Sequence, residues 1–581
     1  MLKVLAKSIR EYKKSSIATP LLVSMEVVLE CIIPFIIAQL VNEIKAGCDL
    51  ATIARYSLVL VVMAGLSLLF GALAGYTCST ASCGLARNLR KDMFYSIQGY
   101  SFENIDRFST SSLVTRMTTD VTNVQNAYMM IIRMAIRCPL MLVFAFVMAF
   151  VMGGRMAFIF LIVAPILGFG LYLVIRRTLP LFRRVFKKYD ALNSSIQENV
   201  KAIRVVKSYV REDYEKRKFG AAAEDVRSDF TQAERILAIT NPLMQFCLYT
   251  VMVFVLSFGS YTIISSHGLL LDVGQFSALL TYSFMILSSL MMVSMVFVMI
   301  TMANESAKRI VEVLTEKSML ENPAQPVCEV KDGSVDFENV SFKYSKKAER
   351  MALSNINLHI ASGETIGIIG STGSSKSSLI QLISRLYDAT EGVVRVGGVD
   401  VRDYDLETLR NQVAVVLQKN VLFSGTIKEN LRWGNPGATD EELAEACKLA
   451  QADEFISRLP AGYDTYIEQG GANVSGGQKQ RLCIARALLK RPKILILDDS
   501  TSAVDTRTDA LIRKAMREFI PQTTKIIIAQ RTASVEDADR IIVMDGGAID
   551  SVGTHAELMA QGGIYAEIYT SQNKAGDSDE N

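Results

Sequence analysis

A turn rich in glycine and serine, between a predicted strand and a predicted helix, carries residue types that bind phosphate. Residues 364–380 read ETIGIIGSTGSSKSSLI. Backbone N–H groups of such a loop, together with the N-terminus of the following helix, can surround a phosphate group. Lys376 would add a positive charge toward the phosphates, and Ser377 a hydroxyl for Mg²⁺. The sequence therefore predicts a phosphate-binding loop.

One position of this loop departs from the usual pattern. Gly370 and Gly373 fit it, but the residue before the lysine, normally glycine, is Ser375. Because glycine allows close backbone approach and dihedral angles that serine tolerates less well, we expect altered nucleotide binding. Taken alone, the motif is degraded. The predicted nucleotide-binding residues of the loop are Gly370, Ser371, Thr372, Gly373, Ser374, Ser375, Lys376, Ser377 and Ser378.

Two further segments decide the interpretation. RPKILILDDSTSAVD is a hydrophobic strand that ends in Asp498 and Asp499, the Walker B pattern. NVSGGQKQRL, about 100 residues after the loop, has Val474–Gln478 in the position of the LSGGQ signature of ABC ATPases. From about residue 334 to 572 the order of motifs resembles an ABC ATPase without gaps.

This resemblance implies roles for the residues that would activate water. Asp498 would orient Mg²⁺ and its waters. Asp499 stands where hydrolytically competent members have the Glu that polarises the attacking water. Gln530, in KIIIAQRTASV, stands where the switch loop usually has His. Glutamine can hydrogen-bond a phosphate but cannot carry a proton or a positive charge, so we expect this chain's own site to be impaired in hydrolysis.

The resemblance also implies contacts with adenine, Mg²⁺ and a second subunit. Tyr344 in VSFKY would stack on adenine, Gln418 in VVLQKN would touch Mg²⁺, and Asp505 belongs to the D-loop that contacts the partner. The signature would reach across a dimer interface to ATP held by the other subunit, so one chain cannot make a complete site. The signature residues are Val474, Ser475, Gly476, Gly477 and Gln478.

The first half of the chain is apolar enough to lie in a membrane. Half of all residues are hydrophobic and mean hydropathy is +0.26, with the apolar runs crowded before about residue 303. The net charge of +3 gives no reason to expect nucleic acid. Six stretches are predicted to span the bilayer: 17–41, 57–79, 134–153, 157–176, 240–266 and 274–303.

The distribution of basic residues predicts the orientation of these spans. The loop from Arg176 to Arg235 holds fifteen Lys and Arg, while the proposed outer loops hold few, so both termini are expected in the cytoplasm. Short outer loops and long helical inner loops resemble the type IV ABC exporter fold. On that resemblance, residues 104–113 and 207–216 would be coupling helices that dock on the ATPase.

Two groups of side chains inside the predicted spans, one charged and one flexible, each allow two interpretations. Glu26 and Glu30, one turn apart, could bind a cationic substrate or form a structural pair with Arg133 or Arg137. The methionines of the last span suit a surface that accepts varied apolar ligands, or ordinary packing and lipid contact. They are Met285, Met291, Met292, Met295, Met299 and Met302.

We therefore predict a multidomain membrane protein: an all-α, six-helix transmembrane domain (1–320), a linker (321–333), an α/β P-loop nucleotide-binding domain (334–572) and a polar tail (573–581). It resembles the degenerate-site subunit of a heterodimeric, multidrug-type exporter in a bacterial plasma membrane. ATP, Mg²⁺, a second half-transporter and a small amphipathic substrate or peptide are the expected partners. A homodimer with slow hydrolysis and an ATP-gated channel or regulator are the alternatives.

Overall fold

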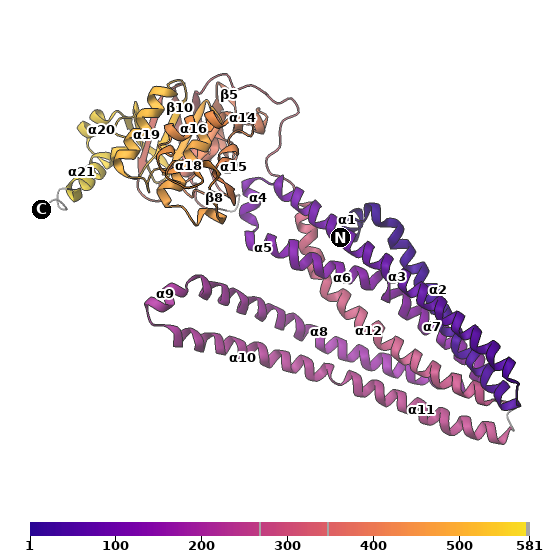
Figure 1. The fold of residues 1–581 in the computed structure, drawn as a ribbon. Coiled ribbons are helices and arrows are strands. Elements are labelled where there is room, and N and C mark those ends of the chain that lie inside the picture. The colour runs from indigo at the N-terminus through magenta and orange to yellow at the C-terminus, as the bar shows by residue number, and fades with distance from the viewer. Residues whose placement is uncertain (267–268, 346–347, 577–581) are drawn as a thin grey trace. The chain divides into compact units, whose positions relative to one another are not determined.

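A computed structural model of the chain describes residues 1–266, 269–345 and 348–576. The chain folds into two units. The first comprises Met1–Gly99 and Phe108–Glu316, and the second Tyr100–Arg107 and Lys317–Asn581. Helices alone build the first unit, whereas the second mixes helices and strands (Figure 1). The boundaries of the four predicted segments stay predictions, and residues 577–581 of the predicted tail lie outside the described residues.

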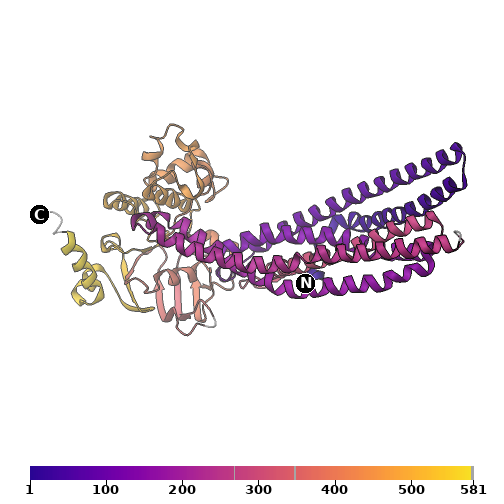
Figure 2. The same ribbon diagram turned by 90° about the horizontal axis from the view of Figure 1, so that it is seen from below.

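Long helices of the first unit contain the predicted spans. Among the described residues, five helical stretches are long and apolar enough to cross a membrane. Figure 2 shows them extending along one common direction. The helices are α1 (Leu2–Lys7), α2 (Lys13–Ala46), α3 (Leu50–Gln98), α5 (Thr110–Thr115), α6 (Val121–Ile132), α7 (Met134–Gly153), α8 (Phe158–Lys201), α9 (Ile203–Ser208), α10 (Glu212–Leu237), α11 (Thr240–Ser265) and α12 (Val273–Thr315).

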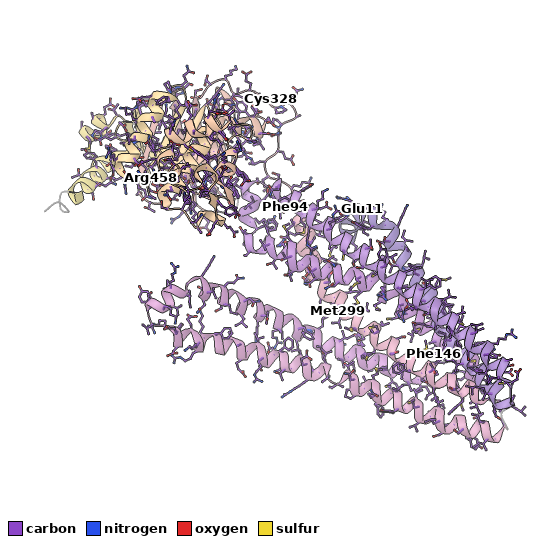
Figure 3. All side chains as sticks on the ribbon, viewed as in Figure 1. Glu11, Phe94, Phe146, Met299, Cys328 and Arg458 are labelled. Atoms are coloured by element: carbon purple, nitrogen blue, oxygen red, sulfur yellow. The ribbon has the colours of Figure 1, made fainter. Side chains whose placement is uncertain are left out.

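The third of these stretches contains two predicted spans. It covers Thr110–Phe182, but α7 ends at a turn where Gly154 has φ +51°. Helix α8 then returns along α7: the ring centroids of Phe146 and Phe160 lie 6.3 Å apart, and those of Phe150 and Phe158 5.4 Å apart (Figure 3 labels Phe146). The five stretches therefore hold six crossing segments, along α2, α3, α7, α8, α11 and α12.

Neither predicted coupling segment is one continuous helix. Helix α4 (Phe102–Arg107) ends inside 104–113, because Ser109 is extended and its hydroxyl accepts the N–H of Ser112 to begin α5. In 207–216, α9 ends at Ser208, and Val210 has a left-handed φ of +52° before α10 begins. Each predicted segment thus contains parts of two helices, and its role in coupling stays a prediction.

Two sheets form the centre of the second unit. The first is antiparallel, in the order β2 (Leu353–Ile360), β1 (Val335–Phe342), β4 (Glu391–Val396), β5 (Val399–Asp400). The second has a parallel centre and an antiparallel edge strand, in the order β12 (Ala548–Gly553), β11 (Arg540–Asp545), β3 (Thr365–Gly370), β10 (Thr524–Ile528), β9 (Ile494–Asp498), β6 (Val413–Val416). Strands β9 and β10 are buried along their whole length, as expected for parallel strands covered on both faces.

Helices and a small two-stranded sheet complete this unit, which is an α/β domain. The small sheet pairs β7 (Gly425–Thr426) antiparallel with β8 (Tyr466–Ile467). Besides α4, the helices are α13 (Lys376–Ile383), α14 (Leu406–Gln412), α15 (Ile427–Arg432), α16 (Asp440–Leu449), α17 (Asp453–Ile456), α18 (Gly476–Leu488), α19 (Thr506–Phe519), α20 (His555–Gln561) and α21 (Ile564–Gly576).

Candidate nucleotide-binding site

Three adjacent parallel strands bring the predicted motifs to one edge of the larger sheet. Ile528 at the end of β10 pairs with Ile368 of β3 and with Asp498 of β9. Because parallel strands end at the same edge, the phosphate-binding loop after β3, the acids after β9 and Gln530 after β10 come together there. Residues from three separate motifs therefore share one site.

Lys376 folds back over the loop that precedes it. Its Nζ donates to the carbonyl oxygens of Gly370, at 2.9 Å, and Ser371, at 2.8 Å, and lies 3.1 Å from Ser374 Oγ. Burial lowers the pKa of Lys376, against the opposing field of nearby carboxylates. The ammonium is therefore held inside the loop before any phosphate arrives.

The loop backbone adopts positive φ angles at three positions. They are +155° at Gly370, +88° at Gly373 and +67° at Ser375. A Cβ at Gly370 would lie 2.1 Å from the carbonyl oxygen of Met544, so only glycine fits there. Ser375 is left-handed, which costs a residue with a side chain about 1–2 kcal/mol. The serine thus stands where glycine would be least strained.

Ser377 and Asp498 form a pair of oxygen donors beside the loop. Ser377 Oγ lies 3.2 Å from Asp498 Oδ1, and Asp498 is 5 % exposed. Burial raises the pKa of Asp498, and the neighbouring charge of Asp499 adds to the shift. A hydroxyl and a carboxylate at this spacing suit Mg²⁺, which prefers hard oxygen ligands and keeps several waters.

Asp499 accepts hydrogen bonds from two side-chain amides. Its Oδ2 receives Gln530 Nε2 at 3.0 Å and Gln418 Nε2 at 3.4 Å. Its backbone is left-handed, with φ +47°, and its N–H donates to the carbonyl of Ile528. Burial raises the pKa of Asp499. The structure therefore brings Gln418, Asp499 and Gln530 into one group, and Gln418 contacts the acid directly.

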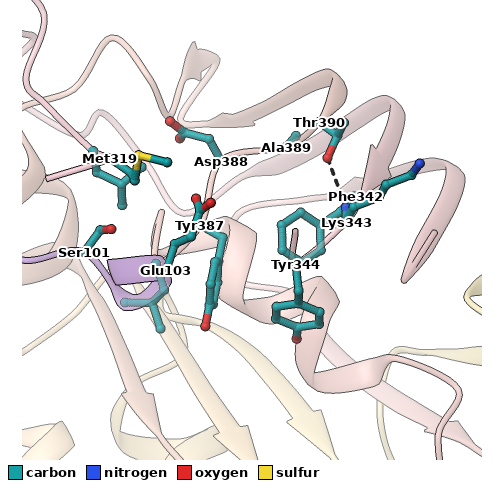
Figure 4. A pocket seen from close by; sticks show the side chains of 12 residues that line it. Ser101, Glu103, Met319, Phe342, Lys343, Tyr344, Tyr387, Asp388, Ala389 and Thr390 are labelled. Carbon is teal, nitrogen blue, oxygen red and sulfur yellow. Dashed lines mark hydrogen bonds between the residues drawn. The ribbon is translucent and has the colours of Figure 1, made fainter. Parts of the chain in front are cut away.

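Tyr344 lies against helix α13, beside a cavity of about 510 Å³ (Figure 4). Its hydroxyl lies 2.8 Å from Ser378 Oγ and donates to Gln381 at 3.1 Å. Its ring meets the ring of Tyr387 edge-on, with centroids 5.2 Å apart. The hydroxyl of Tyr387 in turn donates to Asp106 of α4. Tyr344, the residue predicted to contact adenine, is therefore connected to helix α4 through Tyr387.

Tyr387 was absent from the sequence predictions, and Asp106 entered them only as part of the predicted coupling segment 104–113. The two residues lie 281 positions apart. Helix α4 is fixed further by Asn104, whose Nδ2 donates to the carbonyl of Lys317 and whose Oδ1 accepts the N–H of Met319. No local signal in the sequence identifies Lys317, Met319 or Tyr387 as the partners of this helix.

The signature forms a regular helix start. Ser475 caps α18: its hydroxyl accepts the N–H of Gln478, whose side chain accepts the N–H of Ser475. A Cβ at Gly477 would lie 2.8 Å from the carbonyl of Ala503, so the D-loop packs closely on this turn. Ser475 and Gly476 are exposed. Asp505 caps the next helix, α19, through the N–H of Thr508.

In the first unit, Arg137 pairs with both intramembrane glutamates. It donates to Glu26 and, through Nη2, to Glu30 at 2.8 Å. This is the structural alternative predicted for the two acids. The methionines of α12 differ in environment: Met285 packs against the helix core, whereas Met292 and Met295 are exposed in the single chain, and Met299 lies on the same helix (Figure 3).

Comparison with known proteins identifies the family. Residues 17–291 match the family described as ABC transporter transmembrane region, and residues 353–502 the family described as ABC transporter. An uncharacterised ABC transporter ATP-binding protein of Bacillus subtilis, YfiB, is 36% identical over 95% of both chains. The chain belongs to the ABC transporter family. An ATP-dependent lipid A-core flippase of Aromatoleum aromaticum is 34% identical over 89% of this chain and 85% of its own length.

A solved structure extends this likeness to the whole fold of the ABC exporter. A bacterial Atm1-family ABC exporter with ATP bound superposes with a TM-score of 0.82 at 25% identity, over 97% of this chain and 98% of the other. The chain is thus a half-transporter of an ATP-driven ABC exporter, with a helical transmembrane domain followed by an α/β nucleotide-binding domain. Its second unit is an ATP-binding domain.

Proposed function

We propose that this ABC exporter subunit binds ATP at its own Walker motifs, in a site that is impaired in hydrolysis. Its signature completes the catalytic site of a different partner subunit. The observation that carries the proposal is the environment of Asp499. Its Oδ2 accepts hydrogen bonds from the side-chain amides of both Gln418 and Gln530. Because a general base must direct a lone pair at water, these two amides compete with water for one of the two carboxylate oxygens.

Several features support ATP binding without fast hydrolysis. Lys376 is held in its loop, and Ser377 with Asp498 offers oxygen ligands that fit Mg²⁺. Bound Mg²⁺ would neutralise charge on the phosphates. Asp499 is one methylene shorter than the usual glutamate, and Gln530 cannot take up a proton. Binding groups therefore persist where water-activating groups do not.

The regular start of α18 supports the second part of the proposal. Gly476, which is exposed, and Gly477, which is half-buried, lie at the positive end of a helix of 13 residues. With the capping box formed, this turn is preorganised for a phosphate held by another chain. The partner would then carry the Glu after its Walker B strand and the switch His.

Two apolar surfaces support coupling between partners. The turn after α9 exposes Tyr209 (75 %) and Val210 (81 %). In the nucleotide-binding domain, a hollow of about 380 Å³ beside Gln418 is lined by exposed side chains that include Phe423 and Trp433, whose rings stack 4.2 Å apart. We propose that this turn docks in the hollow of the partner's domain, so that ATP-driven closure moves the spans.

The substrate in this proposal is hydrophobic or amphipathic, and the similarity to a lipid flippase favours a lipid-like molecule. A purely cationic substrate is less favoured, because Arg137 already neutralises part of the charge of Glu26 and Glu30. The same proposal places the chain in a bacterial plasma membrane with both termini in the cytoplasm.

The test compares ATPase rates of this chain alone, of the pair, and of the pair whose partner has Glu→Gln after Walker B. We expect activity only in the unsubstituted pair. If Asp499→Ala in this chain stopped turnover as completely as the partner substitution, the impaired-site proposal would be wrong. Substantial activity of this chain purified without a partner would favour a slow homodimer instead.

A further inference from the structure

The C-terminal helix α21 holds the loop that carries Gln530. Nε2 of Gln572 donates to the backbone carbonyl of Gln530 at 2.8 Å. Its Oε1 accepts the backbone N–H and the hydroxyl of Thr532, each at 2.9 Å. A carboxamide offers a donor and an acceptor in one plane, so it matches backbone groups on either side of Arg531. The contact therefore restrains the two soft dihedral angles of Arg531.

Helix α21 is itself firmly anchored. Tyr565 is 1 % exposed, Ile568 packs against the same hydrophobic core, and the Tyr565 hydroxyl lies 2.7 Å from Nδ1 of His555. Tyr565, Ile568 and Gln572 follow each other at helical spacing on one face. The face that anchors the helix thus also presents Gln572 to the switch loop.

The restrained loop leads directly to the nucleotide site. Thr532 is 2 % exposed, and two residues later Ser534 donates to Asp509 of α19 at 3.0 Å. On the other side, Nε2 of Gln530 donates to Asp499 at 3.0 Å. Gln572 therefore acts on a loop that is fixed at one end and carries the Gln530 side chain at the other.

We propose that Gln572 is a positioning residue that holds Gln530 ready for the terminal phosphate of ATP. The inference rests on the proposed function, in which this chain binds ATP at its own Walker motifs. A preset loop spares the entropy of ordering Gln530 when the nucleotide binds. Because ADP lacks the phosphate that Gln530 would contact, Gln572 favours ATP over ADP.

Chain-resolved photolabelling of the full-length assembled protein with 8-azido-ATP tests this proposal. The label is competed by ATP or by ADP in the presence of Mg²⁺. With Gln572→Ala, we expect the half-protecting ATP concentration for this chain to rise about five-fold, the loss of roughly one hydrogen bond. The ADP value should stay within about two-fold. Gln572→Glu, which keeps the acceptor but loses the donor, should shift ATP in the same direction.

Ser571→Ala, one position away on the exposed side of α21, is the matched control and should change neither value. In a Gln530→Ala background, Gln572→Ala should have no further effect, because the two residues act in series. An equal loss of ATP and ADP affinity, or a full effect without the Gln530 side chain, would show a merely structural role. Failure of the unsubstituted chain to label would contradict the proposed ATP site instead.

Discussion

Two helix N-termini in the nucleotide-binding domain are built differently. Helix α18 begins at Ser475 in an extended conformation with both hydrogen bonds of a capping box. Helix α13 begins after Ser375, which is left-handed and makes no capping hydrogen bond through its side chain. The capping box of α18 satisfies the N–H groups of Ser475 and Gln478, whereas the first turn of α13 has no side-chain cap and follows the phosphate-binding loop.

The departures from the family pattern gather around the second of these ends. Ser375, Asp499 and Gln530 all lie at the edge where β3, β9 and β10 end, whereas the signature retains Gly477 in close contact with Ala503. The signature, which this chain would contribute to the partner's ATP site, keeps the family pattern. The half-site formed by this chain's own Walker motifs departs from it. The two ends can be tested separately.

The largest effect is expected at the signature. Gly477→Val in this chain should lower the ATPase rate of the pair by about 100-fold or more, because its side chain would collide with the D-loop and displace phosphate donors. Asp499→Ala in the same chain should change the rate by less than about two-fold. Steady-state phosphate release measures both. Reversed magnitudes would mean that the roles of the two half-sites are exchanged.

Restoring the missing groups should raise hydrolysis at the altered half-site. In a pair whose partner site is silenced by Glu→Gln, Asp499→Glu with Gln530→His should increase turnover about ten-fold or more, since both a base and a proton-carrying switch residue return. The two single substitutions serve as controls. No gain from the double substitution would place the impairment elsewhere, with Ser375 as the next candidate.

An intermediate effect is expected at the contact between α4 and the cavity beside Tyr344. Tyr387→Phe keeps the ring but removes the hydrogen bond to Asp106, and should lower substrate-stimulated ATPase about five-fold with little change in ATP binding. Tyr463→Phe removes a similar bond to Asp453 and is the matched control. Equal effects of the two changes would point to general destabilisation rather than coupling.

The smallest effect is expected at Ser375. Ser375→Gly should stabilise the nucleotide-free domain by about 1 kcal/mol, because glycine carries no penalty at a left-handed φ. Ser371→Gly, at a position without a positive φ, should not stabilise it. Thermal unfolding of the purified protein compares them. A lower melting temperature for Ser375→Gly would show that the serine hydroxyl contributes more than the backbone costs.

The sequence predicted those parts of the candidate site whose residues lie close together in the chain. The loop before Lys376, the acids after β9 and the signature are each read within about ten residues, and spans are read from hydropathy. The break at Val210 could not be foreseen, since a β-branched residue with positive φ is contrary to local preference. Nor could the pairing of Tyr387 with Asp106, which depends on tertiary folding.

Helix α4 gives the nucleotide-binding domain an unusual kind of boundary. Eight residues, Tyr100–Arg107, belong to this unit although more than two hundred residues of the helical unit separate them from Lys317. Contacts therefore group this helix with the nucleotide-binding domain although it lies within the residues that match the transmembrane family, and a fragment that began at Lys317 would lack it. Such a fragment would leave Tyr387 without its acceptor and open the wall of the cavity to water. Cutting the gene at the apparent junction would thus separate the nucleotide-binding domain from a helix that it contacts.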